Sequence, residues 1–243
     1  MSPTDDELRA LNGVIRYAGW AVYRAERPFA GDAKDLAGRL AAALFGDAPA
    51  PAAGTGGDAP TLVLRGAYDV SGLRADADVM FWVHAPSAEQ VQSAFRAIRR
   101  AAADAGAPLE RVWSAVGLHR EAEFNKTHVP SFLSGRDPLG WLTVYPFVRS
   151  REWYLLPEQE RSQMLAEHGR MGREYPQVAA NTVSAFALGD YEWILPLEAD
   201  NLHDLVDLMR HLRASEARRH VLVETPFYTG RRIELAEIGG VLA

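Results

Sequence analysis

The chain has 243 residues, 48% of them hydrophobic and 24% charged, and its 26 basic and 32 acidic residues give a formal net charge of -6. This composition predicts an ordinary globular protein, and the acidic balance argues against general binding to nucleic acid or to a membrane surface. Cysteine is absent, which excludes disulfides and cysteine nucleophiles, and no apolar run approaches the roughly 18 to 20 residues of a membrane span. We therefore expect a soluble, cytoplasmic protein.

The first half of the chain predicts a helical arm, followed by two helices set among strands. A capped helical arm comes first, at residues 2–13. Apolar spacing then predicts a strand at 14–25, a helix at 32–46, a strand leading into an amphipathic helix within 78–101, and a strand at 111–120. Residues 46–60 are rich in Gly, Ala and Pro without periodicity, so we expect a mobile surface loop there.

The second half repeats this order of elements. Its segment "DYEWILPLEADNLHDLVDLMRHLRAS" aligns with "DVMFWVHAPSAEQVQSAFRAIRRA" in the first half, and an aromatic strand at 140–150 again leads to a helix. A last strand is predicted at 220–230. Such an order is typical of a ferredoxin-like α+β sandwich. We predict an α+β fold with two ferredoxin-like halves, 1–120 and 121–243, which form a barrel-like chain of antiparallel sheets with the helices packed outside.

A predicted helix that opens at Pro157 and ends before Pro176 carries a histidine on its apolar stripe. The stripe consists of Met164, Leu165, His168, Met171, Gly172 and Tyr175. Gly172 costs about 1 kcal/mol relative to alanine in a helix, which suits the close approach of a bulky group. A histidine in this setting is typical of an axial haem ligand. A core histidine bonded to a carbonyl is the alternative, and this helix alone favours that alternative.

The strand "GWLTVYPFVRS" places Tyr145 and Arg149 on one face, about 13 Å apart, which is comparable to the breadth of a tetrapyrrole. Arg149 can then hold a carboxylate while Tyr145 reaches another edge. The alternative is a core tyrosine and a solvated arginine.

A loop rich in Asn, Pro and Gly carries His128 immediately before "VP". A neutral imidazole there can take a proton from peroxide or water. An exposed loop histidine is the alternative interpretation. His119 and Glu121, with His128, form an incomplete candidate set for a small non-haem metal site.

Four segments of the second half together resemble one known family: "NKTHVPSFLSGRDPLGWLTVYPFVRSREWYLLP", "EHGRMGREYP", "DYEWILPLEAD" and "ETPFYTGRR". They resemble the chlorite dismutase-like superfamily and, within it, the coproheme decarboxylases of the actinobacterial type. The resemblance is continuous from residue 125 onward and extends to the first half at the level of fold. It implies two ferredoxin-like halves per chain, a homopentamer, and a tetrapyrrole bound in the C-terminal half.

The resemblance also implies a role for each candidate residue. His168 matches the iron ligand, Tyr145 the tyrosine that carries a radical beside the reacting propionate, and His128 a histidine that deprotonates peroxide. Arg149 matches a basic residue beside the propionates, and Trp153 the edge of the pocket.

Other residues receive supporting roles. Met171 and Gly172 would provide packing space for the porphyrin. Glu192, in "DYEW", is the candidate for a carboxylate that orients the imidazole of His168.

The implied reaction is the peroxide-dependent oxidative decarboxylation of two propionates of iron coproporphyrin III, which is both substrate and redox centre, to give haem b in the last step of haem biosynthesis. A transient contact with the enzyme that supplies coproheme is also expected. One alternative is a chlorite dismutase or peroxidase-type haem enzyme, but residues 178–183 lack the arginine that chlorite chemistry would require there. The other is a non-enzymatic haem-binding or haem-transfer protein, which needs His168 but neither Tyr145 nor His128.

Overall fold

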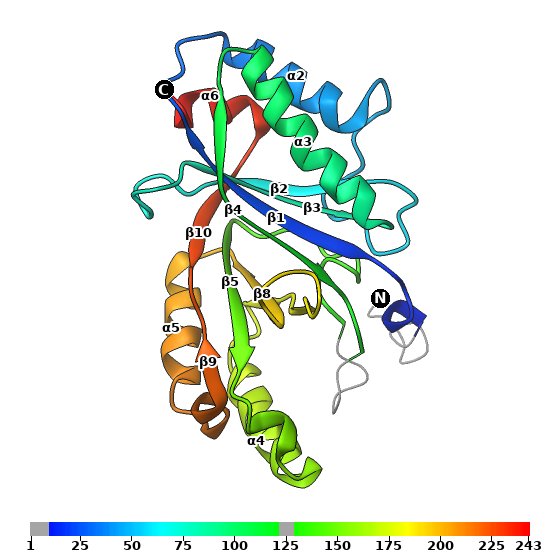
Figure 1. The fold of residues 1–243 in the computed structure, drawn as a ribbon, viewed down its shortest axis with the longest axis vertical. Coiled ribbons are helices and arrows are strands. Elements are labelled where there is room, and N and C mark those ends of the chain that lie inside the picture. The colour runs from blue at the N-terminus through cyan, green and yellow to red at the C-terminus, as the bar shows by residue number, and fades with distance from the viewer. Residues whose placement is uncertain (1–9, 122–128) are drawn as a thin grey trace.

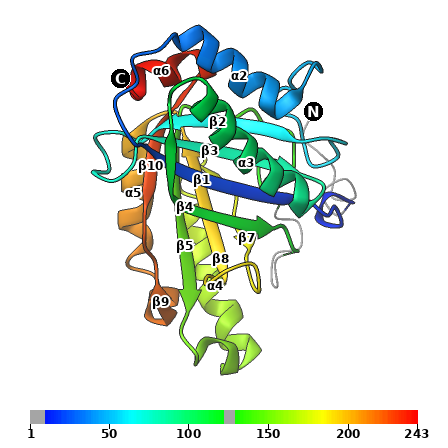
Figure 2. The same cartoon turned by 45° about the horizontal axis from the view of Figure 1, so that its top comes forward.

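The computed structural model describes residues 10–121 and 129–243, in which helices pack outside a closed antiparallel sheet (Figures 1 and 2). In Figure 1 the helices α2 and α3 cover the upper end of the strands, and α4 and α5 lie at the lower end. Within the described ranges every helix is too short or too polar to cross a bilayer. The predicted α+β fold with its helices outside is confirmed.

The first half follows the order strand, helix, strand, strand, helix, strand. Its elements are β1 (Tyr17–Ala25), α2 (Ala33–Phe45), β2 (Val63–Asp69), β3 (Val79–Ala85), α3 (Ala88–Asp104) and β4 (Leu109–Leu118). The side chain of Asp32 caps α2, and that of Ser87 caps α3, by accepting backbone N–H groups of the first turn.

The second half has the same order with short additional strands. Its elements are β5 (Trp141–Arg149), the 3-10 turn η1 (Trp153–Leu155), α4 (Glu158–Gly172), β6 (Ala179–Ala180), β7 (Val183–Ser184), β8 (Trp193–Ala199), α5 (Leu202–Leu212), η2 (Glu216–His220), β9 (Val221–Val223) and β10 (Tyr228–Ile233). The short turn η3 (Leu235–Glu237) and α6 (Ile238–Val241) follow.

Strand pairing between the halves closes the sheet into a barrel. The strand order is β6-β8-β7-β4-β1-β3-β2-β10-β5-β9, and an additional β5–β8 pairing completes the ring. The ladders between these strands are antiparallel, and the halves meet where β10 pairs with β2 and where β7 pairs with β4. Closure leaves only the short strands β6 and β9 at the ends of this order, which limits the open edges that would otherwise template aggregation.

The alternation of side chains along the strands produces separate cores on the two faces of the sheet. On β1, Trp20 and Val22 point into a central cluster shared with β5, β8 and β10, whereas Ala21 and Tyr23 point outward under α2 and α3. A third cluster, containing Tyr145, lies between the outer face of the C-terminal sheet and α5. The candidate site is built around this third cluster.

Two predictions differ from the structure, and two remain untested by it. The single strand predicted at 220–230 is wrong, because β9 and β10 are separate and Glu224–Phe227 run between them. The helix predicted to reach Pro176 ends at Gly172. Residues 46–60 form turns, and Gly57 N–H donates to the carbonyl of Leu133 at 3.0 Å. The mobility of residues 46–60 remains a prediction. The boundary between the two halves at residues 120 and 121 also remains a prediction.

Candidate functional site

His168 lies near the end of α4, on a face that the protein covers only in part. Pro157 precedes the helix, Glu158 and Glu160 lie in its first turn and Arg170 in its last, as the helix dipole favours. Met171 is the one buried residue of α4, although the stripe around His168 is apolar. The face therefore has apolar side chains but no complete protein cover.

The imidazole of His168 is neutral and has a defined hydrogen-bond partner. Its Nδ1 lies 3.4 Å from Ser215 Oγ, which itself donates to the carbonyl of Leu212 at 3.0 Å. Ser215 Oγ must then accept from Nδ1–H, so the lone pair of His168 is on Nε2. Burial lowers the pKa of His168, and the charge of Arg149 lowers it further. A neutral imidazole with a bare Nε2 is the form that binds a metal.

Arg149, at the end of β5, is held on the same side of the molecule. Its guanidinium lies 4.0 Å from the ring centroid of Trp153 and 4.5 Å from that of Phe147, and Nη1 donates to the carbonyl of Ala217 at 3.0 Å. Burial lowers the pKa of Arg149 to about 10. Within the described ranges no carboxylate forms an ion pair with this guanidinium, which leaves its charge available to an anionic group.

Trp153, in η1, is buried, and its ring packs against His220 with centroids 5.4 Å apart. Since His220 ends η2, and Ala217 of η2 binds Arg149, this turn brings Arg149 and Trp153 together. Ser215, which contacts His168, directly precedes the same turn.

Tyr145 lies on β5, four residues before Arg149, and is 4% exposed. Its ring stacks on Phe227 with centroids 4.4 Å apart, and its hydroxyl donates to Met209 Sδ at 3.6 Å. Burial raises the pKa of Tyr145 above its usual range, and the charge of Glu224 raises it further. The side chain is therefore a neutral phenol near neutral pH.

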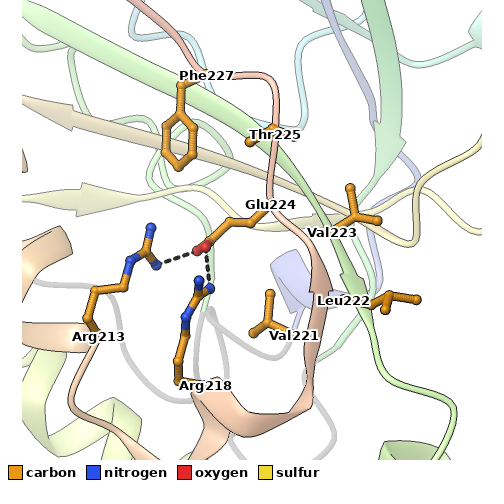
Figure 3. A pocket seen from close by; sticks show the side chains of 8 residues that line it. All are labelled: Arg213, Arg218, Val221, Leu222, Val223, Glu224, Thr225 and Phe227. Atoms are coloured by element: carbon orange, nitrogen blue, oxygen red, sulfur yellow. Dashed lines mark hydrogen bonds and ion pairs between the residues drawn. The ribbon is translucent and has the colours of Figure 1, made fainter.

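A pocket of about 440 Å³ is lined in part by Phe227, the ring that stacks on Tyr145 (Figure 3). It is lined by Arg213, Arg218, Val221, Leu222, Val223, Glu224, Thr225 and Phe227. Figure 3 shows the two arginines converging on Glu224; Arg213 Nη1 binds Glu224 Oε1 at 2.6 Å, and Arg218 binds the other carboxylate oxygen. Two guanidinium groups against one carboxylate leave this pocket with a net positive charge.

The structure leaves space around Gly172. A Cβ added at this glycine would meet no described atom within 4 Å, while Met171 beside it is buried. The protein itself does not fill this position, and the roles predicted for Gly172 and Met171 toward a porphyrin stay predictions.

Of two other predicted site residues, one is corrected by the structure and the other lies outside the described residues. Glu192 does not orient His168: its Oε2 accepts from the backbone N–H of Arg149 at 2.8 Å and from the hydroxyl of Tyr154 at 2.7 Å. The partner of the imidazole is Ser215 instead. His128 lies outside the described residues, so its predicted place near the site stays a prediction.

The small metal site considered at His119, Glu121 and His128 stays a prediction, because His128 lies outside the described residues. The described ranges hold no group of three side chains able to bind a metal ion. His119 is buried, with Nε2 placed 2.7 Å from Asn12 Oδ1. In the segment that lacks an arginine, Asn181 is fully buried and accepts from the backbone N–H of Phe132.

Sequence reasoning missed five residues of this region: Arg213, Ser215, Arg218, Glu224 and Phe227. The sequence signal of Arg213, Ser215 and Arg218 is a concentration of charge at the end of α5 and directly after it, in "RHLRASEARRH". Glu224 and Phe227 lie in "ETPFYTGRR", a segment that carries the family resemblance. Nothing in the local pattern shows that the chain turns back at η2 and brings these side chains to Tyr145 and His168.

The residues present fit an iron tetrapyrrole that carries carboxylates. His168 offers a bare Nε2 for the metal, and the half-covered apolar face of α4 offers a surface for a flat macrocycle. Arg149, Arg213 and Arg218 offer guanidinium groups to carboxylates.

The comparisons with known proteins agree with this fit. The chlorite dismutase family model matches residues 43–233. A coproheme decarboxylase of Mycolicibacterium smegmatis is 50% identical over 233 residues, which are 96% of this chain and 96% of that protein. A coproheme decarboxylase of Thermus thermophilus is 27% identical over 100 residues, 39% of this chain and 40% of that one. The structure of chlorite dismutase from Candidatus Nitrospira defluvii in complex with imidazole matches with a TM-score of 0.74 at 20% identity, covering 97% of this chain and 98% of the other.

Proposed function

Because this chain belongs to the chlorite dismutase family, we propose that it is a coproheme decarboxylase, which converts iron coproporphyrin III to haem b with hydrogen peroxide as the oxidant. The identity of 50% along nearly the whole of a coproheme decarboxylase carries this assignment. The geometry around His168, Arg149 and Tyr145 supports it independently.

Each round of the reaction removes two electrons from one propionate side chain. A propionate, a proton and a hydrogen peroxide give a vinyl group, carbon dioxide and two water molecules, which balances atoms and charge. Two rounds convert the substrate to haem b. The iron of the substrate would supply the oxidising centre, and the protein contributes binding, orientation, control of protons and a tyrosine that relays the oxidation to the propionate.

His168 and the arginines are the groups that hold the substrate. The neutral imidazole of His168 presents Nε2 to the iron. Arg149 is fixed between Trp153 and Phe147, so its guanidinium can orient a propionate without losing much side-chain entropy. Arg213 and Arg218 line the pocket beside Phe227 and provide further carboxylate-binding groups.

Tyr145 is the group that reacts with the propionate. Because its pKa is raised, it stays protonated, and it would give up an electron and a proton together to the substrate iron once peroxide has oxidised it, which forms a neutral phenoxyl radical. The radical takes a hydrogen atom from the β-carbon of the propionate, which restores the phenol. Loss of a second electron to the same oxidant, together with loss of carbon dioxide, then leaves the vinyl group. His128 is assigned the task of taking a proton from hydrogen peroxide.

Chlorite chemistry is the less suitable alternative, because the 178–183 segment offers Asn181 and no arginine. A haem carrier would have no use for a buried phenol beside a pocket lined by guanidinium groups. The homopentameric state and the transient contact with a coproheme-supplying enzyme belong to this proposal and are drawn from the family resemblance. The cytoplasmic location also belongs to it and is drawn from the composition of the chain.

The decisive experiment adds hydrogen peroxide to the protein loaded with iron coproporphyrin III and follows tetrapyrrole masses by chromatography and mass spectrometry. We expect a mono-decarboxylated species and then haem b. The Tyr145→Phe variant should bind the substrate with an unchanged absorbance spectrum and lose nearly all turnover, because phenylalanine cannot carry the radical. Full activity of this variant would refute the role of Tyr145, and binding without any decarboxylation by the unsubstituted protein would place the chain among the carriers.

A further inference from the structure

Ser215 is an N-terminal cap residue whose side chain does not cap its own turn. It precedes η2 with extended backbone angles of φ -75 and ψ 145, where a serine usually accepts a backbone N–H of the turn. No such bond forms at η2. The hydroxyl instead donates to the carbonyl of Leu212 and lies 3.4 Å from Nδ1 of His168. Its proton is thus directed to the end of α5, and its acceptor side faces His168 of α4.

A neighbouring hydrogen bond fixes the same two segments. Glu167 Oε2 accepts from the backbone N–H of Glu216 at 2.9 Å, so a carboxylate from α4 takes over part of the missing cap. Two successive residues of α4, Glu167 and His168, therefore bind two successive residues, Glu216 and Ser215, across the contact. Ser215 is only 4% exposed, so water does not compete freely for its hydroxyl.

We propose that Ser215 is the positioning residue of the iron ligand, a role that rests on the proposed ligation of iron by His168. Because its own proton is committed to Leu212, the hydroxyl oxygen accepts from Nδ1–H and fixes the tautomer that exposes Nε2. A hydroxyl is a neutral and therefore weaker acceptor than a carboxylate, so the imidazole keeps its proton and little imidazolate character develops.

The test compares Ser215→Ala and Ser215→Asp with the unsubstituted protein, each loaded with ferrous coproheme. Resonance Raman spectroscopy of the iron–histidine stretching vibration is the readout. The alanine variant loses the acceptor, so the frequency should shift downward and the band should broaden. The aspartate variant offers a carboxylate, so the frequency should shift upward. Opposite shifts are not expected of a residue that only supports the fold.

Glu167→Gln is the matched control, because it weakens the adjacent contact between α4 and η2 without changing the partner of the imidazole. Its iron–histidine frequency should equal that of the unsubstituted protein. If Glu167→Gln shifts the band as much as Ser215→Ala does, or if neither Ser215 variant shifts it, the proposal is wrong. In the apo-protein, ¹⁵N chemical shifts should report the Nδ1–H tautomer of His168, and a predominant Nε2–H tautomer would overturn the proposal even if the variants do not fold.

These outcomes differ from a failure of the proposed function. If His168→Ala leaves the spectrum of the coproheme complex unchanged, His168 is not the iron ligand and both proposals fall. If that variant loses the iron–histidine band but the Ser215 variants do not move it, the ligand assignment stands and only the role of Ser215 is overturned.

Discussion

His84, in β3, is a fully buried histidine outside the proposed site. Its Nδ1 accepts a 2.9 Å hydrogen bond from Arg16 Nε, and within the described ranges its Nε2 has no partner. Burial holds the pKa of His84 well below its usual value, and the charges of Arg16 and Arg65 lower it further. The imidazole is thus neutral in the folded state, which couples folding to pH.

The folded protein should therefore lose stability as the pH falls below the unfolded pKa of His84. Below about pH 6.5 the unfolded state binds a proton that the folded state does not, which costs up to about 1.4 kcal/mol of unfolding free energy per pH unit. His84→Asn keeps an acceptor oxygen for Arg16 but does not titrate. Urea unfolding of the apo-proteins between about pH 7.5 and pH 5 should show a shallower loss for this variant. Parallel curves for the two proteins would contradict the linkage.

At the residue scale, the sequence predicted the residues that carry the chemistry better than it predicted the residues that contact them. His168 and Tyr145 could be identified because their side chains lie on periodic faces and because their segments resemble a known family. The partner of His168 could not, since Ser215 lies 47 positions away and reaches the imidazole only through the turn at η2. Glu192 was a reasonable guess for a carboxylate, but the backbone N–H of Arg149 binds it instead.

The connection from α5 through η2 and β9 to β10 is the element that lines the pocket in Figure 3. Its apolar run "HVLV" and the following "PFYTG" predict one strand, because the local pattern does not reveal a break. Pro226, which lacks an N–H, cannot continue a ladder, so the chain leaves the sheet between β9 and β10. That interruption is what places Glu224 and Phe227 at the pocket.

Removing the positive charge of this element should weaken the binding of coproheme more than that of haem b. Coproheme carries four propionates and haem b two, so the substrate has more carboxylates to place against Arg213 and Arg218. A charge-assisted hydrogen bond contributes about 1.5–3 kcal/mol when shielded, and both arginines are partly exposed, so we expect a loss of about tenfold for Arg218→Ala. Absorbance titrations with both tetrapyrroles give the two dissociation constants.

The control for that titration is Arg39→Ala, which removes the same charge from an exposed pair with Asp35 on α2. It should change neither dissociation constant. An equal loss of affinity for coproheme and haem b in Arg218→Ala would show that the arginine does not distinguish the additional propionates.

At the scale of the whole molecule, the two halves form one structure. The central cluster takes Trp20 and Trp82 from the first half and Leu142, Val144 and Ile194 from the second. The duplicated order of elements was predictable, because each strand and helix has its own period. The closure of the sheet was not, since pairings such as β2 with β10 join segments far apart in the chain.

A buried ion pair also joins the halves. Arg65, on β2, binds Glu198 Oε2, on β8, through Nη2 at 2.8 Å and Nε at 3.3 Å, and both side chains are fully buried. Asn181 donates to the same oxygen at 3.1 Å. Burial raises the pKa of Glu198, and the charge of Arg65 opposes this shift.

Because this pair and the central cluster connect the halves, unfolding of the chain should be a single cooperative transition. Far-UV circular dichroism and tryptophan fluorescence should give the same urea midpoint.

Arg65→Met leaves the buried carboxylate of Glu198 without its partner and should lower the free energy of unfolding by about 3–5 kcal/mol. The double variant Arg65→Met/Glu198→Leu removes both charges and should recover much of that loss. In each variant the two probes should still coincide, because the pair stabilises one folding unit, whereas separate midpoints would mean that the halves unfold independently.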